Sequence, residues 1–321
     1  MNVSTCPNCR FPNRRGANFC AMCGRELTHD LSAGHSANAP TMPFNPSWPE
    51  MAAAEDADTL RARPNLDVHV GRHTDVGRLR ESNEDSLLVL EGAWNNRSVS
   101  RPVGLFVVAD GIGGNEGGEI ASGMLVSGLA RRAAELLPAM LAADEPFNGG
   151  AWLTVAIQAC NEEIYEWARE AGYDMGTTVV AVLLQGEQAT VAHVGDSRVY
   201  LINAGRIEQL TVDHSLVESL VIANQISREE ARAHPNANVI YRTVGDQPDV
   251  VVDLRAVRLL PGDRLLLCSD GLSGMIADGM IHGLVLSASS PQAACVALVD
   301  AANEAGGEDN CTVVLVELQA L

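Results

Sequence analysis

The chain has 321 residues, 46% of them hydrophobic, and a formal net charge of −19. That length and hydrophobic content can form one sizeable core and a small appendage, whereas no apolar run approaches the roughly 18 residues of a membrane span. The acidic balance disfavours nucleic-acid binding through the bulk surface, and the absence of lysine excludes a lysine nucleophile or Schiff base. The first ten residues lack the charged-then-apolar layout of a secretory signal, so we expect a cytoplasmic protein with no membrane and no nucleic-acid partner.

Residues 1–26 carry two CxxC pairs, formed by Cys6 with Cys9 and by Cys20 with Cys23. Ten residues separate the pairs, and four thiolates at this spacing can surround one zinc ion tetrahedrally. The intervening segment is too short for a hydrophobic core, so the metal would have to hold this unit folded. We therefore predict a zinc-ribbon with one structural Zn²⁺; a redox-active dithiol pair is the alternative. The four other cysteines lie singly in apolar stretches, where thiols are ordinary core residues.

Residues 27–66 are rich in Ala, Pro, Ser, Asn and Asp and show little periodicity, as in a flexible linker. From residue 67, short apolar runs rich in β-branched residues predict strands at 86–90, 103–109, 177–184, 189–194, 198–202, 250–257, 264–268 and 311–318. Helical spacing predicts helices at 118–141, 151–170, 215–234 with a break near Gln225, and 291–304. Most strands follow one another directly, which favours an α+β layered fold with mostly antiparallel sheets over a doubly wound parallel sheet.

A glycine cluster, VVADGIGGNEGGEIAS, occupies residues 107–122. It is not a Walker loop, because that motif needs a lysine. It is not a dinucleotide fingerprint either, because the third glycine position falls on Glu116, whose carboxylate would repel a phosphate.

Four acids lie at or beside predicted strand ends: Asp85, Asp110, Asp270 and Asp309. If they converge in space, their carboxylates would repel one another unless a hard divalent cation neutralised them. A glycine directly after an aspartate, as at Gly111, would let the backbone approach such a cation. Asp-Gly is also a frequent turn dipeptide, so this pattern alone leaves a metal site and plain turns both open.

The chain from about 67 to 318 resembles the metal-dependent protein serine/threonine phosphatases of type 2C in their bacterial form. The resemblance rests on seven motifs in order: TDVGRLRESNEDS (74–86), VVADGIGGNEGGEIAS (107–122), MGTTVVAVL (175–183), VAHVGDSRVYLI (191–202), LTVDHSLV (210–217), LLLCSDGLS (265–273) and GGEDNCTVV (306–314). It implies a phosphatase domain at 67–319, with a β-sandwich of two antiparallel sheets flanked by helices. It also implies hydrolysis of phosphoserine and phosphothreonine in proteins by a metal-bridged hydroxide.

The resemblance assigns roles by position. It implies two Mn²⁺ or Mg²⁺ ions bridged by Asp110, with the Gly111 carbonyl on one of them. Asp270 and Asp309 would hold the first ion. Asp85 would hold the second, partly through water, and Glu84 would lie just outside the direct ligands of that ion. Arg80 would grip the substrate phosphate in a fork of hydrogen bonds.

Two departures from the family pattern bear on the chemistry. Ile112 stands where some members carry a histidine proposed as the leaving-group acid, so that proton must come from metal-bound water or from elsewhere. Tyr173 stands where bacterial relatives carry an aspartate for a third metal, and Asp174 follows one place later, so a third site at Asp174 is left open.

Residues 215–240 resemble the mobile flap that helps to admit the protein substrate. We interpret Asp196, Ser197, Asp213 and His214, which also belong to family motifs, as supporting structure.

Three functions remain in competition. The first is a phosphatase acting on phosphoproteins, opposing a bacterial serine/threonine kinase or acting on its targets. The second is the same chemistry in a partner-switching pathway with one dedicated regulator as substrate, and the third is a catalytically dead scaffold. The intact acids and Arg80 argue against the scaffold. The zinc-ribbon is expected to recruit a partner or substrate.

Overall fold

The computed structural model describes residues 3–5, 12–14, 65–96, 99–113, 117–142, 147–232 and 234–321. The chain divides into two units, Met1–Pro64 and Asn65–Leu321. Within the described part of the first unit, β1 (Val3–Thr5) pairs antiparallel with β2 (Pro12–Arg14). The cysteines of the predicted zinc-ribbon, Cys6, Cys9, Cys20 and Cys23, lie outside the described residues, as does the predicted linker up to residue 64.

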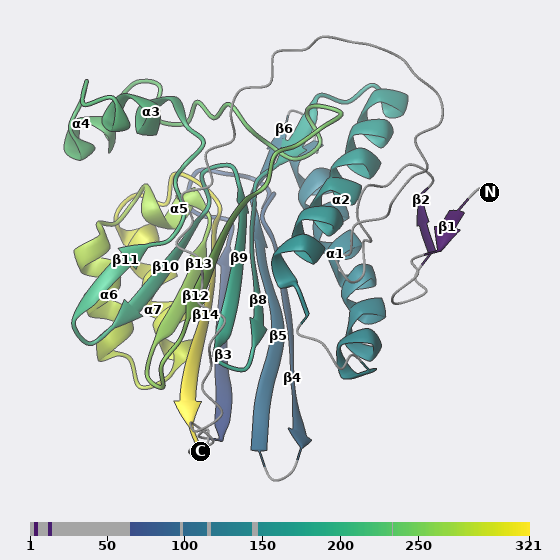
Figure 1. Cartoon of the computed structure of the whole chain (residues 1–321). Helices are drawn as coiled ribbons and strands as arrows, with labels where there is room; N and C mark the ends of the chain where they lie inside the picture. Colours follow the sequence, from purple (N-terminus) through teal and green to yellow (C-terminus); the bar gives the residue numbers. More distant parts are fainter. Residues whose placement is uncertain are drawn as a thin grey trace. The chain divides into compact units, whose positions relative to one another are not determined.

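Two five-stranded antiparallel sheets form the second unit (Figure 1). The first sheet has the order β11 (Arg206–Gln209), β10 (Arg198–Asn203), β13 (Arg264–Cys268), β14 (Cys311–Ala320) and β3 (Leu66–Asp75). The second has the order β12 (Asp253–Arg258), β9 (Gln188–Val194), β8 (Val179–Gln185), β5 (Val99–Ala109) and β4 (Ser86–Asn96). The predicted sandwich of antiparallel sheets is confirmed.

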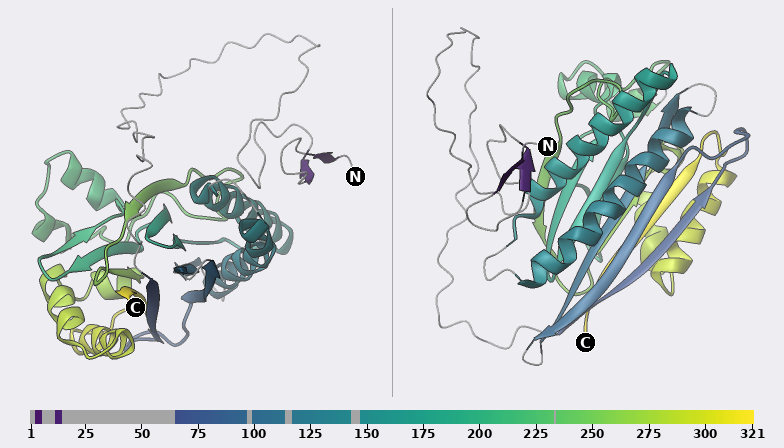
Figure 2. Two further views of the ribbon diagram at one scale, coloured as in Figure 1. Left: turned by 60° about the horizontal axis from the view of Figure 1, so that its bottom comes forward. Right: turned by 90° about the vertical axis from the view of Figure 1, so that its right-hand side faces the viewer.

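Helices cover the outer faces of the two sheets. The helices α1 (Gly117–Ala142) and α2 (Gly149–Ala171) pack on the sheet that contains β5, and α6 (Asp278–Ser287) and α7 (Pro291–Glu304) lie on the other sheet, on the opposite side of the molecule (Figure 2). Within the described residues, no helix is long and apolar enough to cross a membrane.

The central strand β5 shows why the sequence forms this sandwich. Successive side chains of a strand point to opposite faces. Leu105 and Val107 accordingly pack in the core beneath α1 and α2, whereas Phe106 and Val108 pack in the core between the sheets. A strand buried on both faces needs the continuous apolar run that the sequence has at 103–109. The four cysteines Cys160, Cys268, Cys295 and Cys311 are buried and free, so their interpretation as core residues is confirmed.

Several short elements differ from the prediction. The predicted strand at 177–184 is two strands, β7 (Met175–Thr177) and β8, and β7 pairs with β6 (Gly111–Gly113). The predicted strand at 250–257 begins only at Asp253, because Val250 and Val252 pack into the core under α2 without pairing. The predicted break near Gln225 is confirmed by two short helices, α3 (Leu216–Ile222) and α4 (Arg228–Arg232). The elements β3, β6, β11, α5 (Asp270–Ser273) and α6 were not predicted.

Candidate active site

The antiparallel register brings the ends of four strands to one end of the sandwich. Ser86, the first residue of β4, lies opposite Ala109, the last residue of β5. In the other sheet, Cys268 at the end of β13 lies opposite Val313 near the start of β14. The acids singled out from the sequence lie just outside these termini: Asp85 and Asp110 are adjacent to their strands, and Asp270 and Asp309 lie two residues from theirs. The fold therefore places them on the same edge of the two layers.

These acids converge on a cavity of about 230 Å³. The residues that line it include Arg80, Glu84, Asp110, Gly111, Ile112, Asp196, Asp270, Asp309 and Asn310. Asp85 lies next to it, within electrostatic reach of Asp110 and Asp270. The hydroxyl of Ser269, which follows β13, donates to Asp85 Oδ2 at 2.8 Å, and this contact ties the two sheets together. The spatial convergence that the sequence left open is present.

Burial and mutual repulsion make this group of acids unusual. Burial, followed by neighbouring acids, raises the pKa of Asp85 to about 7 and that of Asp270 to about 6. The pKa of Asp110 is also raised, by burial first and then by the charge of Asp85. Asp85 Oδ1 and Asp270 Oδ1 are buried and have no hydrogen-bond partner among the described residues. Buried oxygens without partners carry a large desolvation penalty, which a bound cation would relieve.

Glycine 111 places its backbone against the acid cluster. A Cβ atom there would lie 2.2 Å from the carbonyl oxygen of Gly118 and 2.6 Å from that of Glu84. The Gly111 N–H donates to the Glu84 carbonyl at 3.2 Å, so β6 is held against the segment that carries Glu84 and Asp85. The absence of a side chain therefore lets three backbone segments meet beside Asp110.

The donor set fits a hard divalent cation, because it consists of carboxylates and a backbone carbonyl and contains neither sulfur nor imidazole. In the described ranges, no group of three or more His, Cys, Asp or Glu side chains is arranged so that it could hold a metal ion without rearrangement. Two of the carboxylates are engaged with protein groups: Asp309 accepts from Arg80 at 2.6 Å, and Asp85 accepts from Ser269. The fit to a cation therefore rests on the chemistry of the donors and on the two buried oxygens without partners.

Arg80 supplies a positive charge at the rim of the cavity. Its side chain is half exposed. Burial lowers its pKa, but the combined attraction of Asp309, Glu84 and Asp270 outweighs that effect, so the pKa is raised. The guanidinium group can thus remain charged at the cavity mouth, where a planar fork of donors suits a phosphate group.

Asn310 is a site residue that the sequence interpretation missed. Its amide donates to the carbonyls of Val76 and Ser82 at 2.9 Å each, and its side-chain oxygen accepts from the Glu84 N–H at 2.8 Å. One buried side chain therefore fixes both ends of the loop that carries Arg80. The signal was a lone amide residue directly before the apolar run of β14.

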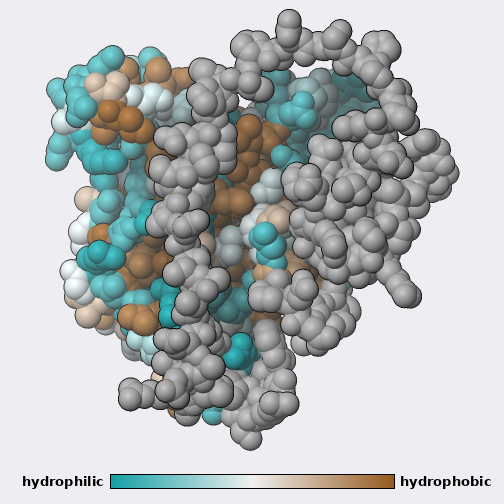
Figure 3. Space-filling view, in the orientation of Figure 1, coloured by the Kyte–Doolittle hydropathy of each residue, from teal (hydrophilic) through white to brown (hydrophobic). Residues whose placement is uncertain are grey.

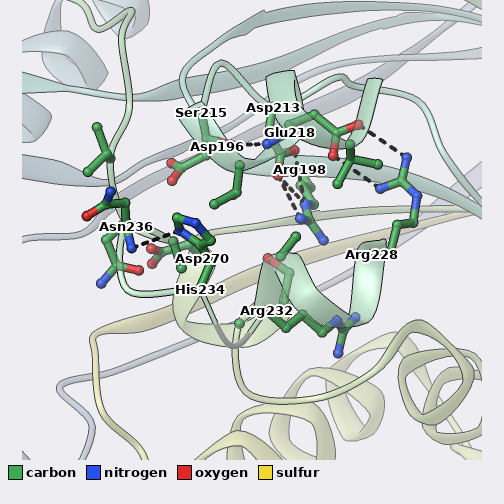
Figure 4. A pocket seen from close by; sticks show the side chains of 18 of the residues that line it. Asp196, Arg198, Asp213, Ser215, Glu218, Arg228, Arg232, His234, Asn236 and Asp270 are labelled. Atoms are coloured by element: carbon green, nitrogen blue, oxygen red, sulfur yellow. Dashed lines mark hydrogen bonds and ion pairs between the residues drawn. The ribbon is translucent and has the colours of Figure 1, made fainter. Parts of the chain in front are cut away.

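A second, larger cavity adjoins the first. It measures about 500 Å³ and lies between the flap (residues 215–240, of which residue 233 is not described) and the strand and helix ends beneath it. Asp196 and Asp270 line both cavities. Figure 4 shows the pairs that surround it: Arg198 with Asp213, at 2.6 Å, and Arg228 of the flap with Glu218, at 3.2 Å.

Asp174 does not line the cavity with the other acids. Its side chain is exposed, and only its backbone carbonyl approaches the Gly113 position. The ring of the neighbouring Tyr173 packs at a tilt against Trp167, with ring centroids 5.5 Å apart. Ile112, by contrast, lines the cavity at the place where some family members have a histidine.

An antiparallel β-sandwich that gathers buried carboxylates and an arginine at its strand ends is the architecture of a metal-dependent phosphatase. Comparison with known proteins specifies the family: residues 81–300 match the family model described as Protein phosphatase 2C. A serine/threonine phosphatase of Listeria welshimeri is 40% identical over 253 residues, which are 78% of this chain and 96% of the relative. The chain belongs to the protein phosphatase 2C family, whose members are metal-dependent protein phosphatases.

Solved structures agree with this assignment. The serine/threonine phosphatase Stp1 from Staphylococcus aureus matches with a TM-score of 0.68 and 33% identity over 79% of this chain and 96% of that one. The catalytic domain of the phosphatase PstP in complex with two manganese ions matches with a TM-score of 0.65 and 32% identity over 79% of this chain and all of that one, 100%.

Proposed function

We propose that this chain hydrolyses phosphoserine and phosphothreonine in proteins, with two Mn²⁺ or Mg²⁺ ions as cofactors. The observation that supports this most strongly is the convergence of Asp110, Asp270 and Asp309 on one cavity with Arg80 at its rim, in a member of the protein phosphatase 2C family. Loss of a ligand would be expected in a scaffold without activity, so the intact acids favour an enzyme.

The proposed ligands are those that the resemblance to the phosphatase family implies. Asp110 would bridge the two ions, and the Gly111 carbonyl would bind one of them. Asp270 and Asp309 would hold the first ion. Asp85 would hold the second, with Glu84 behind it. When bound, the ions would lower the pKa of water and offset the charge of the phosphoryl oxygens.

The protein groups then have separate tasks. Arg80 holds phosphoryl oxygens through its fork of donors, for which its guanidinium must share or leave Asp309. Ile112 has no proton to donate, so the leaving alkoxide must take its proton from metal-bound water or from another group. Ser269 and Asn310 keep Asp85 and the Arg80 loop in place.

The remaining parts of the proposal rest on the sequence. We propose a zinc-ribbon at 1–26 held by Cys6, Cys9, Cys20 and Cys23, a linker at 27–66 and a phosphatase domain at 67–319. The protein would act in the cytoplasm on substrates of a bacterial serine/threonine kinase, and the zinc-ribbon would recruit the substrate or a partner.

Removal of residues 1–64 should leave hydrolysis of a small substrate intact and weaken action on the native target. The cut falls before residue 65 because Leu66 is buried in the domain and the Leu321 N–H donates to the Asn65 carbonyl. Equal loss on both substrates would contradict a recruiting role.

The decisive experiment compares wild type with Asp270→Asn. Hydrolysis of p-nitrophenyl phosphate and of a phosphothreonine peptide is measured with Mn²⁺ and after chelation. Wild type should turn over both substrates only with metal, and the variant should lose most of that activity. An inactive wild type, or an unimpaired variant, would overturn the proposal.

A further inference from the structure

The turn Gly195–Ser197 joins β9 to β10 and lies between the two cavities. Asp196 lines both of them, and Arg198, two residues further on, lines the larger one. Gly195 has a positive φ of 110°, and a Cβ there would lie 2.6 Å from Thr178 Cγ2. Residue 195 must therefore be a glycine for the turn to pack directly against Thr178, which follows β7.

On the catalytic side, the turn reaches Asp110 through one intermediate side chain. Ser197 Oγ and Thr178 Oγ1 share a hydrogen bond of 2.7 Å, and both residues are buried. The Thr178 hydroxyl in turn accepts from the Asp110 N–H at 3.0 Å. The Asp110 carbonyl accepts from the Thr178 N–H and from the Thr177 hydroxyl, each at 2.8 Å. Both backbone groups of Asp110 are thus fixed, and with them the position from which its carboxylate extends.

On the side of the flap, two hydrogen bonds hold the turn to His214, the residue that precedes the flap. The His214 N–H donates to the Gly195 carbonyl at 2.7 Å, and the Gly195 N–H donates to His214 Nδ1 at 3.0 Å. Burial, followed by the charge of Arg242, lowers the pKa of His214, so the ring stays neutral and Nδ1 is free to accept. The next residue, Ser215, caps the first helix of the flap by accepting from the Glu218 N–H.

The flap itself is thinly packed. Its described residues include Ile222 and Val239, which are 63% and 47% exposed. Figure 3 shows hydrophobic residues at the surface among hydrophilic ones over α3 and α4, at the upper left. A displacement of the flap would be transmitted to the rest of the domain through the residue that joins them. That residue is His214, which is hydrogen-bonded to Gly195.

We propose that the turn Gly195–Ser197 couples the position of the flap to the geometry of Asp110. Ser197 and His214 are positioning residues in this arrangement: Ser197 acts on Asp110 through Thr178, and His214 acts on the turn through Gly195. The inference rests on the proposed function, because it assigns Asp110 to the reaction centre. It gives the flap a second task besides admitting substrate, namely to hold the bridging carboxylate in its working orientation.

The first test removes single hydroxyl groups. Ser197→Ala and Thr178→Val should each lower kcat for p-nitrophenyl phosphate by about tenfold with little change in KM, and should weaken the Kd of Mn²⁺ measured by calorimetry by about tenfold. Thr178→Ser keeps the hydroxyl and should restore both values. Thr211→Val is the matched control, because this buried hydroxyl accepts from the Val199 N–H at 3.3 Å and makes no contact with Asp110. A purely structural role would lower the melting temperature and leave kcat and the Mn²⁺ Kd unchanged, and that result would overturn the proposal.

The second test asks whether the flap anchor acts through the same turn. His214→Ala should reduce kcat by a similar factor, and the variant that combines it with Ser197→Ala should lose less than the product of the two single effects, because both loosen one element. Losses that multiply fully would mean that His214 and Ser197 act independently, which would refute the coupling. A wild type without phosphatase activity would overturn the proposed function instead. The calorimetric Kd values would still decide the coupling in that case.

Discussion

Replacing Asp85 with asparagine should stabilise the metal-free protein while abolishing its activity. Part of this residue is exposed, but its carboxylate Oδ1 is buried without a hydrogen-bond partner among the described residues. Its pKa is raised from 3.8 to about 7, chiefly by burial. A shift of about three units at 1.36 kcal/mol each corresponds to about 4 kcal/mol of destabilisation by the ionised form. For a domain of this size, that is a rise in melting temperature of about 10 °C for the neutral amide.

The pH dependence of this stabilisation would identify the burial of the ionised Asp85 carboxylate as its cause. Below pH 3.8 the carboxyl group is protonated in both the native and the unfolded state, so the stability it contributes is fully present. As the pH rises through about 7, the native state must release a proton that it holds more tightly than the unfolded chain does, and that stability is lost. The advantage of Asp85→Asn should therefore open between about pH 4 and pH 7 and be largest at pH 8.

The assay is thermal unfolding of chelator-treated protein at pH 5 and pH 8. Asp300→Asn, on the exposed face of α7, serves as the matched control and should leave the melting temperature within about 1 °C at either pH. Mn²⁺ should remove the advantage of the asparagine variant, because the metal stabilises the charged carboxylate of wild type. An unchanged or lower melting temperature at pH 8, or a gain that does not depend on pH, would refute the reasoning.

Three further predictions concern the surroundings of the site. Gly111→Ala should destabilise the fold by about 3 kcal/mol in urea denaturation, whereas Gly123→Ala, on α1 with open space around its Cβ position, should stabilise it by about 1 kcal/mol; equal effects would contradict the close approach at residue 111. Arg80→Lys keeps the charge and loses the fork, so kcat/KM for a phosphothreonine peptide should fall by about tenfold, and full activity would argue against phosphate recognition by Arg80. Asp213→Asn should lower the free energy of unfolding by about 3 kcal/mol, since it leaves the largely buried Arg198 charge without its carboxylate; a neutral result would show that solvent reaches the pair.

The main elements of the fold could be predicted from the sequence because their patterns are local. The run at 103–109 is apolar at every position, and a strand buried on both faces requires this. The elements that were missed lack such a pattern. β3 is an edge strand in which most positions are only partly covered, and α6 contains two glycines in ten residues. Their structure depends on packing against β14 and α7, which no local pattern records.

The candidate site divides in the same way. The acids Asp85, Asp110, Asp270 and Asp309 could be selected because each lies beside an apolar run, and the antiparallel register then explains why they meet. The supporting contacts of Asn310 could not be predicted, because they join residues more than two hundred positions apart. A polar side chain that bridges distant segments has no signature beyond its own identity.

Most of the places where the described part of the protein breaks the ordinary rules of burial lie close to its proposed chemistry. Among the described residues, the buried side-chain atoms without a partner are Asp85 Oδ1, His193 Nε2, Asp270 Oδ1 and Asn303 Oδ1. Two of them belong to the acid cluster, and His193 stacks on His214 at 4.6 Å, directly behind the turn that holds Asp110. A fold that buries carboxylates with too few counter-charges gives up stability that its apolar layers must supply. Such a cluster is useful only if a cation restores the balance, and the same electrostatic cost that lowers the stability of the metal-free protein would then appear as affinity for the metal.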